Sequence, residues 1–79
     1  MTPDNFEAGF AFAIQLWRFG MTWEAISHHE HYDASAYGRG MYAAVEAMSG
    51  WVNVAEREAR AFGFDHDAAR ALVAQAVDA

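Results

Sequence analysis

The chain has 79 residues, which fits one domain with a small core, because a domain of this size buries only about 60% of the surface its unfolded chain exposes. Eleven acidic residues outnumber five arginines for a net charge of −6, and neither lysine nor cysteine occurs. The charge argues against direct binding of nucleic acid or anionic membranes, which need converging cations, and the missing cysteine excludes disulfides, thiolate metal ligands and cysteine nucleophiles.

Abundant alanine, a lone proline and the lack of alternating apolar residues predict an all-α fold. We expect a single helical domain over residues 1–79. It would be a compact bundle of four short helices, one of them the long central helix, or of five helices if that helix breaks at Gly50. No basic residue precedes the first apolar stretch, which is also too short to span a bilayer, so we expect a soluble, cytoplasmic protein.

The first helix is expected to have Thr2 as its N-cap, Pro3 as its first helical residue and Asp4 near the positive end of its dipole. Gly20 would end it as a left-handed cap. Between these points apolar residues recur at helical spacing and define the buried stripe: Phe6, Phe10, Phe12, Ala13, Leu16, Trp17 and Phe19.

A second, shorter helix is expected to begin after Thr22, to carry the histidines and to fray near Tyr32. Either Asp33 or Ser35 would cap the third helix, in which Gly40 permits close approach of another helix. The apolar stripe of this third helix is long: Tyr37, Met41, Ala44, Met48, Trp51, Val52, Ala55, Ala59 and Phe62.

The glycines that follow mark the later helix boundaries. Gly50 indicates a kink or a break in the long stripe, and Gly63 is expected to close it. Asp65 would cap the last helix, whose apolar side carries Ala69, Leu72, Val73 and Ala76.

Three of the four histidines lie close together, at His28, His29 and His31. A zinc site needs three or four ligands, and this spacing is not that of a His-Glu-x-x-His motif. A surface that responds to pH is a second option, because histidine titrates near neutrality. We favour a third option, an exposed, polar helix end, and expect no metal ligand and no cofactor.

No catalytic motif stands out. Ser27 and His28 are neighbours on a helix and do not face each other, so they cannot form a nucleophile–base pair. The glycines around Arg39 lack the strand and the lysine of a phosphate loop. We therefore expect that the protein is not an enzyme.

One functional alternative is a helix-turn-helix DNA-binding transcriptional regulator. Residues 20–26 are similar to the opening of the first helix of such a unit, and residues 35–40 to the start of a recognition helix. Arg39 would then reach a base edge. The same helix continues with Glu46 and offers no second cation, which weighs against this alternative.

The aromatic content points to an interaction surface. Three tryptophans, three tyrosines and six phenylalanines are more than so small a bundle can bury fully, and exposed Trp and Tyr are favoured interface anchors. Homodimerisation or docking on a larger partner would cover them. Trp23 and Tyr32 are candidate partner-binding residues because they flank the acidic, histidine-rich stretch.

The short, single-domain, acidic and cysteine-free character of the chain, without a catalytic motif, resembles that of small phage-encoded anti-CRISPR proteins. The resemblance implies an inhibitor in the host-cell cytoplasm that binds a Cas effector complex and blocks its DNA-binding surface. Such a DNA mimic would compete with phosphate for a basic nucleic-acid-binding partner. We expect the carboxylates of Glu24, Glu30, Asp33 and Glu46 to contribute, with Trp23 and Tyr32 as anchors.

Overall fold

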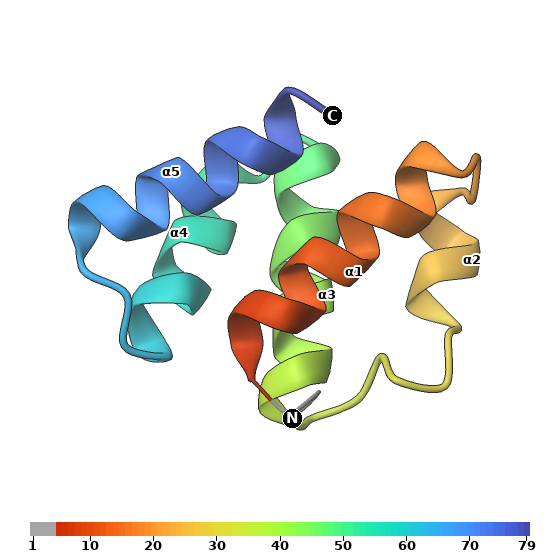
Figure 1. Cartoon of the computed structure of the whole chain (residues 1–79), viewed down its shortest axis with the longest axis horizontal. Helices are drawn as coiled ribbons and strands as arrows, with labels where there is room; N and C mark the ends of the chain where they lie inside the picture. Colours follow the sequence, from red (N-terminus) through yellow and green to blue (C-terminus); the bar gives the residue numbers. More distant parts are fainter. Residues whose placement is uncertain (1–4) are drawn as a thin grey trace.

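The computed structural model describes residues 5–79 and shows five helices without a strand in that range. They are α1 (Phe6–Arg18), α2 (Trp23–Ser27), α3 (Ala36–Met48), α4 (Val52–Ala61) and α5 (His66–Val77). The all-α prediction is confirmed, in its five-helix form. Helix α3 is central, because it packs against each of the other four helices (Figure 1).

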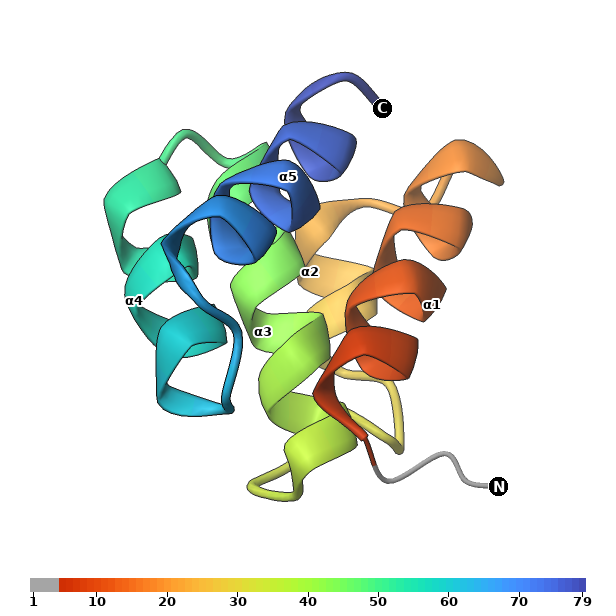
Figure 2. The same ribbon diagram turned by 60° about the vertical axis from the view of Figure 1, so that its left-hand side comes forward.

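The helices form two layers. The described body measures 29 × 26 × 17 Å, and its shortest extent is about two helix diameters. Helices α1 and α5 lie in front of α3 and α4 in Figure 1, and the turned view in Figure 2 shows α4 and α5 as a hairpin beside α3. No helix in residues 5–79 is both long and apolar enough to cross a membrane.

Polar side chains cap four of the five helix starts. Thr22 and Asp65 accept backbone N–H bonds at 3.1 and 2.7 Å, as the sequence predicts. Of the two candidates for α3, Ser35 is the cap. The expected start of the first helix at Thr2–Asp4 lies outside the described residues; within them α1 begins at Phe6, after the cap Asn5.

Three helices end in the same way, at Gly20, Gly50 and Gly63, whose φ angles are 98°, 101° and 99°. After α1 the N–H of Met21 donates to the Leu16 carbonyl at 3.1 Å, which is the six-to-one bond of a Schellman motif. The same bond follows α3 and α4. The break at Gly50 therefore divides the long predicted stripe into α3 and α4, which lets α4 and α5 fold back on α3.

Helices α1 and α3 cross through two glycines. A Cβ on Gly9 would overlap the carbonyl oxygen of Tyr37, and one on Gly40 would overlap that of Phe6. The predicted role of Gly40 in close helix contact is confirmed, and Gly9 supplies the other half of the crossing. The core that this crossing organises includes the fully buried Phe10, Ala13, Ile26, Met41, Ala43 and Ala44.

Helix α2 is shorter than the sequence suggests, and the expectation that it carries the histidines is wrong. It ends at Ser27, and residues 28–31 form turns in which the His28 and His29 N–H groups donate to carbonyls three residues back. The reason is the lack of further buried surface. Ile26 is the one fully buried side chain of α2, and a helix this short depends on packing.

Candidate protein-binding site

Three of the predicted carboxylates lie along one stretch of chain that contains neither lysine nor arginine. Glu24, Glu30 and Asp33, here called the acidic strip, are all exposed. No lysine or arginine occurs between Arg18 and Arg39, so this stretch of α2 and its following loop holds three carboxylates and three histidines but no strongly basic side chain. The strip follows the outer edge of the molecule along the segment coloured yellow in Figure 1.

Asp33 remains charged while it supports the start of α3. Its Oδ1 accepts a hydrogen bond from the Ser35 N–H at 2.9 Å and another from the Ser35 hydroxyl. These bonds stabilise the carboxylate and lower the pKa of Asp33 from its ordinary value. Because Asp33 is exposed as well as ionised, its charge faces solvent, where a partner can meet it.

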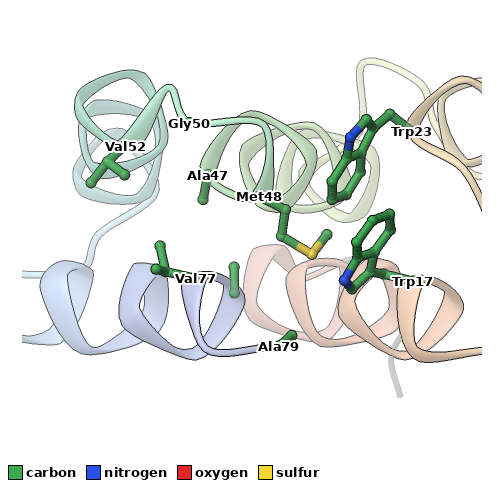
Figure 3. A pocket seen from close by; sticks show the side chains of 9 residues that line it. Trp17, Trp23, Ala47, Met48, Gly50, Val52, Val77 and Ala79 are labelled. Atoms are coloured by element: carbon green, nitrogen blue, oxygen red, sulfur yellow. The ribbon is translucent and has the colours of Figure 1, made fainter.

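The predicted anchor Trp23 does not point along the acidic strip but turns toward α1. Its indole stacks on that of Trp17, with ring centroids 3.7 Å apart and planes 8° from parallel. The Schellman turn at Gly20 brings the two tryptophans together by reversing the chain after α1. The pair forms one wall of an apolar groove of about 340 Å³ (Figure 3).

The groove lies where the C-terminal ends of α1, α3 and α5 meet. Ala47 and Met48 of α3 line it, together with Val52 of α4 and Val77 of α5. Figure 3 shows the Met48 thioether beside Trp17 and the two valines across the opening from the tryptophans. Trp51, between the lining residues Gly50 and Val52, is 60% exposed, and Val77 is 55% exposed, so this end of the molecule presents apolar surface to solvent.

A cluster of polar side chains around Arg39 joins α3 to α4. Arg39 donates from Nε and Nη2 to Glu58 Oε1, at 3.0 and 2.6 Å, and its guanidinium lies 4.6 Å from the ring centroid of Tyr42. Tyr32 meets Tyr42 edge-on, with centroids 6.4 Å apart. Burial, reinforced by the charge of Glu46, raises the pKa of Tyr32. The predicted residues Tyr32 and Glu46 thus lie close together, beside an arginine that is already paired.

Two of the three clustered histidines, His29 and His31, pack against an aromatic ring of α1. The rings of His29 and His31 lie 5.1 and 6.4 Å from that of Phe12, in edge-on contacts, and 5.3 Å from each other. His29 Nδ1 accepts the His31 N–H at 3.2 Å, while His28 is exposed. Across residues 5–79 no three histidine or carboxylate side chains are grouped so as to hold a metal ion.

The six predicted partner-binding residues therefore lie in three settings. Glu24, Glu30 and Asp33 form the acidic strip, Trp23 lines the groove, and Tyr32 and Glu46 belong to the cluster around Arg39 and Tyr42. Sequence reasoning missed the groove. Trp17, Met48 and Val52 fit the predicted helical stripes and so are expected in the core, and Val77 belongs to none of those stripes; only the surplus of aromatic residues indicated that some apolar surface stays exposed.

Comparison of the chain with protein-family models, with curated proteins and with solved structures found no match. The functional proposal therefore rests on the residues of this chain.

Proposed function

We propose that this protein is a small acidic inhibitor that binds a basic, nucleic-acid-binding protein and occupies the surface that otherwise holds phosphates. By its resemblance to anti-CRISPR proteins, the partner is a subunit of a Cas effector complex. The observation that carries the proposal is the acidic strip, in which Glu24, Glu30 and Asp33 are exposed and no cation lies between Arg18 and Arg39.

Electrostatics supports a basic partner. A net charge of −6 on so small a chain accelerates encounter with a positively charged groove, and carboxylates can compete there with phosphate oxygens. Elsewhere in the molecule carboxylates are partly neutralised, as in the Arg39–Glu58 and Arg60–Glu56 ion pairs, with N–O distances of 2.6 and 3.6 Å. In the strip, three exposed carboxylates follow one another along the chain, and none of them forms an ion pair with an arginine of residues 5–79.

The geometry weighs against the alternative of a helix-turn-helix regulator. The connection from Ser27 to Ala36 is longer than the roughly three- to four-residue turn of that motif. Helix α3, in the position of the recognition helix, packs against all four other helices. Arg39, the residue that would read a base, is bound to Glu58 and stacked on Tyr42.

The test is inhibition of DNA binding by a panel of purified Cas effector complexes, measured over increasing salt. We expect the protein to block at least one of them and to lose potency as salt rises, because screening weakens exposed charges. Replacing the strip by Glu24→Gln, Glu30→Gln and Asp33→Asn should weaken inhibition by about tenfold or more, as expected for three exposed ion pairs.

The matched control neutralises three exposed carboxylates outside the strip, through Glu7→Gln, Asp67→Asn and Asp78→Asn. Both triple variants have the same net charge, so a general charge effect would weaken inhibition equally in the two. Equal loss would refute the role of the strip, and failure to inhibit any effector complex would refute the proposed partner class.

A further inference from the structure

We infer that the apolar groove beside the acidic strip receives the apolar face of a basic amphipathic helix of the partner. The groove is the one lined by Trp17, Trp23, Met48, Val52 and Val77. The inference rests on the proposed function, because it takes the partner to be basic, and it adds which structural element of that partner is bound.

The chemistry of the groove favours a protein segment over a small ligand. Small-ligand sites enclose their ligand and place a few converging polar groups around it. Here the opening is broad, and the two indole N–H groups are the polar side-chain groups among the lining residues. An apolar trough between helix ends, with few polar groups to orient a small molecule, is typical of sites that hold the apolar face of a helix.

The walls of the groove are suited to this role. The stacked Trp17 and Trp23 rings form a flat wall that loses little side-chain entropy on binding, because each ring already holds the other in place. Met48 in the floor is flexible and adapts to different apolar side chains. Val77 lies opposite the tryptophans and is largely exposed, so a partner that covers it removes apolar surface from water, which favours binding.

Charge decides between a basic helix and a second copy of this chain. Trp23 is followed directly by Glu24, so the tryptophan wall leads into the acidic strip, and Val77 is followed by the exposed Asp78. Arg18 is the one cation next in sequence to a lining residue. A second copy would bring a charge of −6 against −6, whereas lysines and arginines on a helix would meet carboxylates at both edges.

The experiment uses three synthetic peptides of equal length and titrates each into the whole protein at low and moderate salt. One is an amphipathic leucine–lysine helix, the second has the same composition in an order that breaks the apolar face, and the third replaces each leucine by serine and keeps every lysine. We expect the amphipathic peptide to bind about tenfold or more tightly than the other two. Its binding should weaken less with rising salt than that of the serine–lysine peptide, because screening acts on the lysine contacts and not on the apolar contacts.

Val77→Ser should weaken binding of the amphipathic peptide by about tenfold, because it removes buried apolar area, and leave the serine–lysine peptide unaffected. Val77 is 55% exposed, so the substitution spares the fold. The control is Phe19→Ser. Phe19 is 79% exposed and lies two residues after Trp17, on the other side of the helix end, so its loss should change neither affinity.

The outcomes separate this inference from the proposed function. If all three peptides bind alike and Val77→Ser has no effect, the groove inference is wrong while the acidic strip still binds basic partners. If no peptide binds even at low salt, the proposed function fails as well. If the protein forms dimers that Val77→Ser dissociates, the groove holds a second copy and the inference is overturned.

Discussion

Gly9 and Gly40 determine how closely α1 approaches α3. At both positions the neighbouring atoms are backbone atoms of the other helix, so a side chain cannot be accommodated by a rotamer change. Glycine in a helix costs about 1 kcal/mol relative to alanine. At these two positions it also permits contact between the two helix backbones, which a larger residue would prevent. At each of these glycines, a hydrogen atom in place of a methyl group allows the close crossing that positions α1, the helix that carries Trp17.

Gly40→Ala should therefore destabilise the protein by about 2 kcal/mol, because the overpacking cost of roughly 1–3 kcal/mol exceeds the gain in helix propensity. Thermal unfolding followed by circular dichroism should show the midpoint falling by roughly 8–16 °C, at about 4–8 °C per kcal/mol for a domain of this size. Ala11→Gly, on the exposed side of α1, measures the propensity term alone. A rise in stability for Gly40→Ala would contradict the close crossing.

At the scale of elements, the connection between α2 and α3 is ordered by a few local hydrogen bonds. Ser35 caps α3 by accepting the Gly38 N–H at 3.1 Å, and Asp33 in turn holds Ser35. Asp33, a residue of the acidic strip, is thus tied to the start of the central helix. The position of the strip depends on these bonds, because α2 is too short to be a stable helix on its own.

Ser35→Ala should cost about 1 kcal/mol at neutral pH, since the cap is lost. The pH dependence has a definite sign. The pKa of Asp33 is lowered in the folded state, so its stabilising contribution is present above its ordinary value of 3.8 and lost as pH falls through the folded value.

Ser35→Ala removes the Asp33 bond to the hydroxyl, which makes the largest contribution to that shift, and should flatten the stability profile below about pH 4. Urea unfolding between about pH 7 and pH 2.5 measures both effects. An acid limb as steep in Ser35→Ala as in the natural chain would show that the Asp33 carboxylate gains nothing from the Ser35 hydroxyl, since the backbone N–H bond remains in both.

At the scale of the whole molecule, charge and apolar surface are segregated. The acidic strip follows one edge, the groove opens where three helix ends meet, and Arg39 and Arg60 are paired with Glu58 and Glu56. A molecule with this surface should repel phosphates, because its net charge is −6 and two of its five arginines are already paired with carboxylates. Its partner is expected to supply the positive charge.

The protein should accordingly fail to bind duplex DNA in a gel-shift experiment at about 50 mM salt, where electrostatic attraction is strongest. The strip variant with Glu24→Gln, Glu30→Gln and Asp33→Asn should fail as well, although it is less negative, because its net charge is still negative and Arg39 and Arg60 are still paired. Binding that weakens steeply as salt rises would contradict the paired state of Arg39 and favour the regulator alternative.

Most of the fold could be predicted from local signals. The caps Thr22 and Asp65 and the ends at Gly20, Gly50 and Gly63 were predicted correctly, because each acts on backbone groups a few residues away. The extent of α2 was overestimated, because the burial of Ile26 alone does not extend a helix through His28 and His31. For the site, the sequence indicated the three residues of the acidic strip. Its other three candidates, Trp23, Tyr32 and Glu46, lie in two other parts of the structure.

The sequence by itself determined the all-α class, the negative charge and most of the helix boundaries, because composition and capping act within a few residues. Only the tertiary structure decided that Trp23 stacks on Trp17, that Arg39 forms an ion pair with Glu58, and that an apolar groove remains open between Met48 and Val77. These features join residues from different helices. Their contacts depend on how α1 and α3 cross and on where the chain reverses, and no local pattern records either.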